Sequence, residues 1–140
     1  MNEFTYDEIE ASPEFSASFS VEITHEMMND FKIITGDENP LHVEKEYALS
    51  LGYKDNVVYG LLTASFYSRL AGMYLPGKNC LLQRVDTHFH NPVFVGDVLT
   101  VTGSVKKKVE LGHTLVISAF ITNQDGVVVN TAKIEAGCTR

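Results

Sequence analysis

Residues from about 60 to 74 form an unusual helical segment, because apolar side chains are spread around most of its circumference. The segment contains no Asp or Glu, and Pro76-Gly77 ends it. A surface helix normally combines an apolar stripe with a charged face, so this helix is expected to be buried. The rest of the 140-residue chain must then supply a layer that covers it. Its apolar residues are Leu61, Leu62, Ala64, Phe66, Leu70, Ala71 and Met73.

The second half of the chain is predicted to supply this layer as β-strands. Glu110-Leu111-Gly112 and Gln124-Asp125-Gly126 are short connections of the kind that join hairpins. Consecutive hairpins build an antiparallel sheet, whose apolar face needs a partner. We therefore predict an α+β fold in which an antiparallel β-sheet wraps around the long central helix. The segments rich in Val, Ile, Thr and Phe are residues 80–91, 97–108, 113–123 and 127–136.

The first half is predicted to contain one strand and two short helices. Residues 15–23 alternate apolar and polar side chains, which is the period of a half-buried strand. Thr24 suits a helix N-cap and Gly36 a helix end, and a second short helix is expected over residues 44–51. We expect residues 1–140 to form a single domain, with residues 1–13 as a flexible or peripheral segment. The apolar residues at helical spacing after Thr24 are Met27, Met28, Phe31 and Ile34.

Charge and composition exclude several classes of function. A formal net charge of −7 disfavours nucleic-acid binding, which requires a basic surface. Cys80 and Cys138 lack metal-ligand spacing and are predicted to be free thiols in a reducing compartment. No secretory signal and no apolar run of membrane-spanning length is recognisable, so a cytoplasmic protein without a membrane partner is expected.

The sequence Gly36-Asp37-Glu38-Asn39-Pro40-Leu41-His42 places an acid and a histidine on either side of a tight turn. Such a pair can face one small volume and hold a water molecule for general acid–base chemistry. Asp, Asn and Pro are also common turn formers. The alternative is therefore that Asp37 only ends the helix and that His42 is a loop histidine bonded to a backbone carbonyl.

Gly60 adds a second element of chemistry, because it opens the buried helix. The N-terminus of a helix offers unpaired N–H groups and a positive dipole potential. A glycine there lets a ligand carbonyl approach the backbone closely. Such donors stabilise negative charge that develops on a thioester oxygen. Together with the acid and the histidine, this indicates enolate chemistry.

The segment from Phe31 to His42 closely resembles the hydratase motif of the MaoC-like dehydratase family, which includes (R)-specific enoyl-CoA hydratases. The likeness continues through residues 58–65 and 91–97, and therefore spans nearly the whole chain past residue 20. The resemblance implies the hot-dog fold, in which a sheet wraps around a central helix. It also implies that Asp37 and His42 are the catalytic dyad and that the Gly60 N–H forms the oxyanion hole. Asn39, Tyr59, Leu61 and Ser68 are implied to bind substrate or support the dyad.

The activity implied by the resemblance is the reversible hydration of trans-2-enoyl thioesters to (R)-3-hydroxyacyl thioesters. Asp37 and His42 would activate a water that attacks C3, while the thioester carbonyl is bound by Gly60. The substrate would be a thioester of coenzyme A or of an acyl carrier, and neither a metal nor another cofactor is expected. One departure is that the family usually has His-Gly-Met where this chain has Tyr59-Gly60-Leu61. We interpret Tyr59 as a change of pocket shape and specificity.

Two other functions compete with this hypothesis. Hot-dog thioesterases, like the acyl-carrier dehydratases of this fold, commonly carry a catalytic carboxylate on the central helix, and residues 61–75 contain none. A non-catalytic subunit that binds acyl thioesters is the alternative from a different class. An exposed sheet edge is usually paired or blocked, so we also expect a homodimer or a higher homo-oligomer.

Other polar residues are weaker candidates for a site. Asp86, His88 and His90 alternate and would share one strand face, but no third His or Cys stands at ligand spacing, and no metal site is predicted. The basic run Lys106-Lys107-Lys108 is expected to be solvated, or to meet the phosphates of coenzyme A or an acidic carrier protein. Arg69 and Arg84 are further candidates for this phosphate contact.

Overall fold

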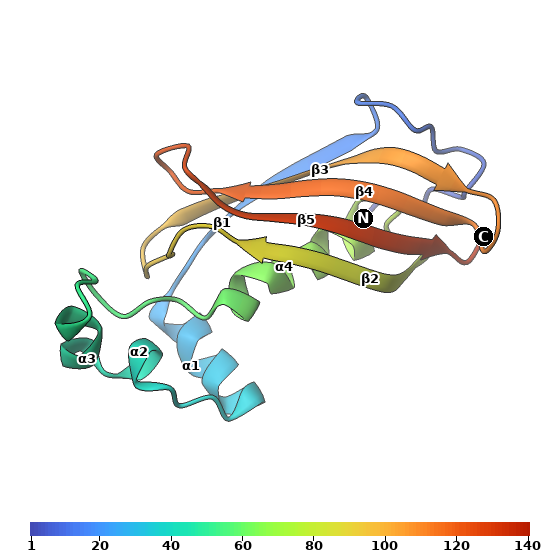
Figure 1. Ribbon diagram of the computed structural model, residues 1–140. Helices are drawn as coiled ribbons and strands as arrows, with labels where there is room; N and C mark the ends of the chain where they lie inside the picture. Colours follow the sequence, from blue (N-terminus) through green and yellow to red (C-terminus); the bar gives the residue numbers. More distant parts are fainter.

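A computed structural model describes residues 1–140, with nine regular elements in an α+β arrangement (Figure 1). The long stretch between the first strand and the central helix contains three short helices. None of the helices is long and apolar enough to cross a lipid bilayer. The helices are α1 (His25–Thr35), α2 (Pro40–Val43), α3 (Lys45–Ser50) and α4 (Gly60–Met73). The strands are β1 (Ser16–Glu22), β2 (Cys80–Phe89), β3 (Val98–Val109), β4 (Thr114–Thr122) and β5 (Val128–Cys138).

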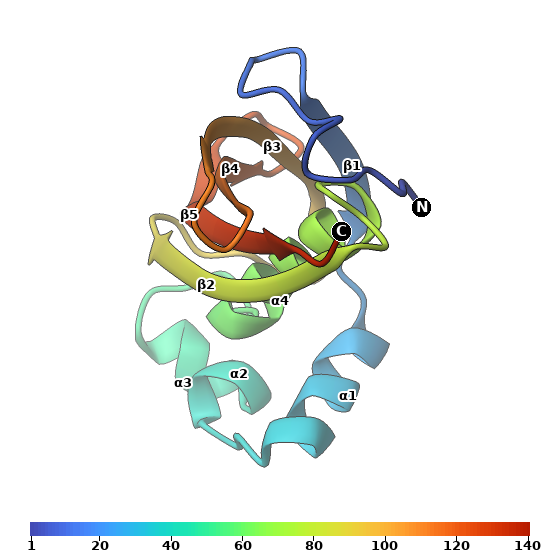
Figure 2. The ribbon, with the colours of Figure 1, turned by 90° about the vertical axis from the view of Figure 1, so that its right-hand side faces the viewer.

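The five strands form one antiparallel sheet in the order β1-β3-β4-β5-β2. The sheet curls around α4, as Figure 2 shows. Alternate side chains of the inner strands point to the helix and are fully buried, among them Val101, Ile117 and Ile134. Helix and sheet approach closely at Gly103, where an added Cβ would lie 2.6 Å from Cδ2 of Leu70. This is the hot-dog fold, and the predicted fold class is confirmed.

Helix α4 is buried on one side only, which corrects the expectation of an entirely buried helix. The sheet covers Leu62, Thr63, Tyr67, Leu70 and Ala71. On the other side, Leu61 is 65% exposed and Met73 is 41% exposed. The reason is geometric, because the curled sheet ends at the edge strand β2 before it closes around the helix. Apolar side chains of β2 are exposed as well, namely Leu81, Leu82, Val85 and Phe89.

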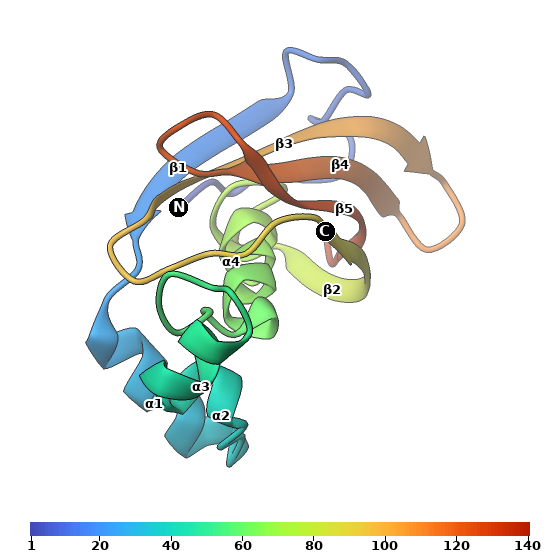
Figure 3. The ribbon, with the colours of Figure 1, turned by 60° about the vertical axis from the view of Figure 1, so that its left-hand side comes forward.

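Helices α1, α2 and α3, with the connecting residues 23–59, form an overhang that stands away from the sheet beside α4 (Figure 3). Helix α1 begins as predicted, since the side chain of Thr24 accepts a hydrogen bond from the Met27 N–H. It ends at Gly36, which adopts the left-handed conformation with φ of 71°. The predicted apolar face extends too far, because Ile34 is 80% exposed beyond the edge of the body.

The Asn39-Pro40 turn predicted from the sequence continues into the short helix α2. The Asn39 side chain accepts a hydrogen bond from the Leu41 N–H, and Pro40 occupies the first turn. Both residues favour a helix start at these positions, which explains the additional turn of helix.

The N-terminal segment, residues 1–13, precedes the first strand and inserts two side chains into the core. Tyr6 and Ile9 are 2% and 1% exposed. The backbone N–H of Tyr6 donates to the carbonyl of Arg140, and that of Asn2 donates to the carbonyl of Met73. The segment thereby ties the end of α4 to the C-terminal residue Arg140, and its Tyr6 and Ile9 side chains belong to the core.

Candidate active site

Asp37 lies in the exposed turn between α1 and α2. Its carboxylate Oδ1 accepts a hydrogen bond of 3.0 Å from the Asn39 N–H, and its own N–H donates to the Thr35 hydroxyl at 3.2 Å. Asn39 in turn caps α2 through its Oδ1, 3.0 Å from the Leu41 nitrogen. The turn-forming interpretation of this motif is therefore correct for Asp37 and Asn39.

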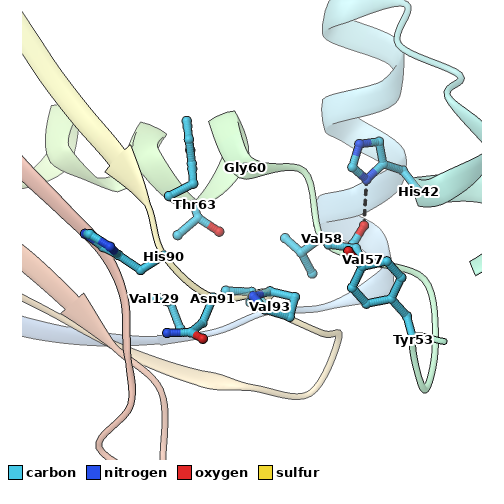
Figure 4. Close-up of a pocket in the computed structure, with 12 residues that line it drawn as sticks. His42, Tyr53, Val57, Val58, Gly60, Thr63, His90, Asn91, Val93 and Val129 are labelled. Carbon is cyan, nitrogen blue, oxygen red and sulfur yellow. Dashed lines mark hydrogen bonds between the residues drawn. The ribbon is translucent and has the colours of Figure 1, made fainter. Parts of the chain in front are cut away.

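His42 is half-buried on α2, and its ring is oriented by one short hydrogen bond. The Nδ1 atom lies 2.7 Å from the carbonyl oxygen of Val57, as Figure 4 shows. A carbonyl oxygen can only accept, so Nδ1 carries the proton in the neutral ring. The Nε2 atom then has a free lone pair, and it makes no hydrogen bond within the protein. This is the tautomer that a general base requires.

Tyr59 contacts both members of the predicted dyad from the residue before α4. Its hydroxyl donates a hydrogen bond of 2.6 Å to the backbone carbonyl of Asp37. Its ring centre lies 4.2 Å from that of His42 and 4.9 Å from that of Phe31. Burial, and then the negative charges of Asp37 and Glu38, raise the pKa of the Tyr59 hydroxyl. The hydroxyl therefore stays protonated and remains a donor at neutral pH.

A pocket of about 280 Å³ connects His42 with the start of α4. The N–H of Gly60 opens this helix and has no acceptor within the protein. Phe89 lies directly over Gly60, where an added Cβ would be 2.9 Å from its ring. The pocket is therefore lined both by the histidine and by the residue that carries the free backbone donor. It is lined by His42, Tyr53, Val57, Val58, Gly60, Thr63, Phe89, His90, Asn91, Pro92, Val93 and Val129 (Figure 4).

The structure brings together only some of the residues singled out from the sequence. His42 and Gly60 line the same pocket. Tyr59 does not line it but contacts the His42 ring and the Asp37 carbonyl, and Asn39 forms part of the turn that carries Asp37. The Asp37 side chain is exposed and does not line the pocket. Leu61 and Ser68 lie elsewhere, because both face a separate groove between α4 and β2. Ser68 stands about two helical turns beyond Gly60 and does not line the pocket of His42.

Several pocket residues were not identified from the sequence. Thr63 follows Gly60 by three residues, so helical spacing alone could have placed both on one face. Val57 acts through its backbone carbonyl, which no residue type reveals. His90 and Asn91 reach the pocket because β2 ends beside the start of α4.

The other polar candidates have partners of their own within the protein. His88 pairs with Asp86 at 3.7 Å, and Nε2 of His90 lies 2.7 Å from the Thr131 hydroxyl. No three His, Cys, Asp or Glu side chains in residues 1–140 are grouped to hold a metal ion. Arg69 stacks on Phe19 and Lys108 on Tyr6. Arg84 forms ion pairs with Asp86 and Glu135.

Comparison with known proteins defines the class of this hot-dog protein. The model of the MaoC like domain matches residues 6–124. An (R)-specific enoyl-CoA hydratase from Aeromonas caviae is 32% identical over 103 residues, which are 74% of this chain and 77% of that protein. An enzyme of the same name from Rhodospirillum rubrum is 33% identical over 90 residues, 64% of this chain and 62% of that protein.

The fold agrees with a solved structure of the same class. An unliganded (R)-hydratase from Pseudomonas aeruginosa superimposes with a TM-score of 0.87 at 25% identity, covering 96% of this chain and 84% of that one. The chain belongs to the MaoC-like dehydratase family, as the resemblance predicted.

Proposed function

We propose that this protein catalyses the reversible hydration of trans-2-enoyl-CoA thioesters to (R)-3-hydroxyacyl-CoA thioesters. The observation that carries the proposal is that His42 and Gly60 line one pocket, since the His42 Nε2 and the Gly60 N–H both have no hydrogen-bond partner within the protein. The names of the relatives from Aeromonas caviae and Rhodospirillum rubrum supply the substrate class and the stereochemistry.

In the hydration direction, the Gly60 N–H donates to the thioester carbonyl and makes C3 of the enoyl group electrophilic. A water loses one proton to the active-site pair and its oxygen bonds to C3, while the carbon–carbon double bond shifts to an enolate. A proton is then delivered to C2, and the thioester is restored. One water is added overall, the thioester bond stays intact and no external electron carrier is needed. The reverse sequence is a dehydration.

His42 is well arranged to accept the proton of the water. Its Nδ1–H is held by the Val57 carbonyl, so Nε2 is the only ring position that can take up a proton. We assign Asp37 to the orientation of the same water. This assignment is supported by the Tyr59 side chain, which contacts the Asp37 carbonyl and the His42 ring at once.

Helix α4 supports a hydratase over a hot-dog thioesterase. Its sequence from Gly60 to Met73 contains no carboxylate that could attack or activate water from the helix. The acid of the motif instead lies on the overhang, before the helix begins. This position suits addition of water to C3 better than attack on the thioester carbon, which Gly60 would hold at the helix N-terminus.

We propose a homodimer as the minimal assembly. The groove between α4 and β2 is lined by Leu61, Ala64, Ser65, Ser68, Leu82, Val85 and Thr87, and it has a volume of about 280 Å³. It lies beside the edge strand β2, whose outer backbone groups are unpaired within the sheet. A second copy would cover this side of α4 and pair the edge, which explains why the exposed side of the helix carries Leu61 and Met73.

The test follows the enoyl absorbance of crotonyl-CoA with the wild type and with Asp37→Asn and His42→Ala. Asparagine keeps the oxygen that accepts the Asn39 N–H and removes only the charge. We expect each variant to lower kcat by at least about 10³-fold. Asp125→Asn and His88→Ala make the same changes at exposed positions outside the pocket, and they should retain wild-type rates. A wild type that binds crotonyl-CoA and leaves its enoyl band unchanged would show instead a non-catalytic acyl-binding protein.

A further inference from the structure

Thr63 carries a buried hydroxyl that has no partner in the protein. The residue is 3% exposed, and its Oγ1 atom makes no hydrogen bond. It lies on α4 one turn after Gly60 and lines the same pocket. Figure 4 shows its hydroxyl pointing into the space beside Gly60. A buried polar atom is almost always paired in a folded protein, so this one requires an explanation.

The usual local solution for a threonine in a helix is not used here. Such a hydroxyl can bond to the carbonyl four residues earlier, which for Thr63 is that of Tyr59. That carbonyl already accepts the N–H groups of Leu62 at 3.1 Å and Thr63 at 3.2 Å. The hydroxyl therefore remains available to a molecule in the pocket.

The only other unpaired buried side-chain atom is different in kind. It is Nδ2 of Asn130, whose Oδ1 accepts hydrogen bonds from Tyr67 at 2.7 Å and Thr87 at 2.8 Å. Asn130 does not line the pocket and belongs to a network between α4 and the sheet. Thr63 alone combines burial, a missing partner and access to the pocket.

We propose that the Thr63 hydroxyl donates a second hydrogen bond to the thioester oxygen held by the Gly60 N–H. Residues three apart share one face of a helix, and side chains tilt toward its N-terminus. The Thr63 hydroxyl is thereby directed to the atom that Gly60 binds. This inference rests on the proposed function, because it requires a ligand whose carbonyl gains negative charge. In that case the two donors share the charge of the enolate, and neither transfers a proton.

The experiment compares Thr63→Val with Thr63→Ser and with the matched control Thr114→Val. Valine keeps the shape of threonine and removes the hydroxyl, whereas serine keeps the hydroxyl. The Thr114 hydroxyl is also buried, but it donates to Gln83 at 3.1 Å and lies outside the pocket. Thermal unfolding, kcat/KM for crotonyl-CoA and trans-2-hexenoyl-CoA, and the dissociation constant of crotonyl-CoA in a His42→Ala background are measured for each.

Thr63→Val should raise Tm by roughly 2–5 °C and lower kcat/KM about 10- to 100-fold, equally for both chain lengths. It should also weaken binding of crotonyl-CoA in the His42→Ala background. Thr63→Ser should stay within about threefold of the wild type. Thr114→Val should lower Tm and leave the kinetics unchanged. This opposite pair of effects is the signature of a hydroxyl that is unpaired until the ligand binds.

Unchanged kcat/KM and unchanged binding in Thr63→Val would overturn the inference, as would a loss confined to the longer acyl chain. A wild type without hydratase activity would refute the proposed function instead. The binding comparison would then still decide about Thr63, since equal dissociation constants would exclude a contact with the ligand.

Discussion

The body of the molecule and the overhang are held together by different forces. In the body, β4 alone contains five buried residues among its nine. In the overhang, only five of the 37 residues from 23 to 59 are buried, namely Ile23, Met28, Ala48, Val58 and Tyr59. Burial of apolar side chains therefore stabilises the sheet and α4, whereas the overhang buries few side chains and gains less stability from this source.

The overhang is positioned by hydrogen bonds between side chains and backbone. Tyr59 reaches Asp37 across 22 positions of sequence, and His42 reaches Val57 across 15. Asn56 donates to the Leu41 carbonyl at 3.3 Å and so joins α2 to the segment that leads into α4. Each bond contributes little to global stability, but together they determine where the acid and the imidazole stand. Stability and chemistry are therefore separated in space, which mutations can test.

The largest effect is expected from a cavity in the body. Ile117 on β4 is fully buried, and Ile117→Ala should lower the free energy of unfolding by about 3 kcal/mol. Ile33→Ala is the matched change on the overhang, where the side chain is 77% exposed, and it should alter stability by less than about 0.5 kcal/mol. Urea titration measures both. Equal losses in the two variants would show that the overhang shares the core of the body.

The same separation explains what the sequence could predict. Alternation and helical periodicity report burial, so the strands, the buried face of α4 and the fold class followed from residues 80–136 and 60–74. The helix caps could also be predicted from the sequence, because Thr24 and Gly36 are the N-cap and the C-cap of α1. Both signals act over a few residues and need no tertiary information.

The arrangement of the site depends on tertiary contacts and was only partly predictable. The pairing of Tyr59 with Asp37 and the use of the Val57 carbonyl by His42 join distant segments. The open side of α4 was missed because the apolar composition of a helix does not reveal which of its sides the sheet covers. Leu61 and Ser68 line the groove on this open side, and their predicted part in substrate binding stays a prediction.

A smaller effect is expected when the overhang loses one of its positioning contacts. Tyr59→Phe removes the hydroxyl that holds the Asp37 carbonyl and leaves the ring against His42. We expect kcat for crotonyl-CoA to fall about tenfold with a smaller change in KM, because the acid turn is less well fixed. The freed carbonyl lies in an exposed turn and can be hydrated, so the loss of stability should stay below about 1 kcal/mol.

Tyr47→Phe is the control for this variant, since Tyr47 lies on α3, is 42% exposed and makes no hydrogen bond through its hydroxyl. It should reproduce the wild-type kcat and KM. A Tyr59→Phe enzyme with wild-type kcat and an unchanged pH profile would limit the hydroxyl to a structural role. The position of Asp37 would then depend on its own turn alone.

The smallest effect is expected on the free energy of unfolding of the body at alkaline pH. Cys138 is 8% exposed beside Cys80, its partner across β2 and β5, and burial raises the pKa of the Cys138 thiol to about 11. In the unfolded chain the thiol ionises near its ordinary pKa of 9.0. The contribution of this thiol to stability is therefore complete below pH 9. It is lost as pH rises toward 11, because the unfolded state releases the proton first and is thereby stabilised relative to the folded state. Between pH 9 and 10 the loss should be roughly 1 kcal/mol. Cys138→Ala should flatten the pH dependence of the unfolding free energy in this range, whereas an equally steep decline in the variant would assign it to other groups.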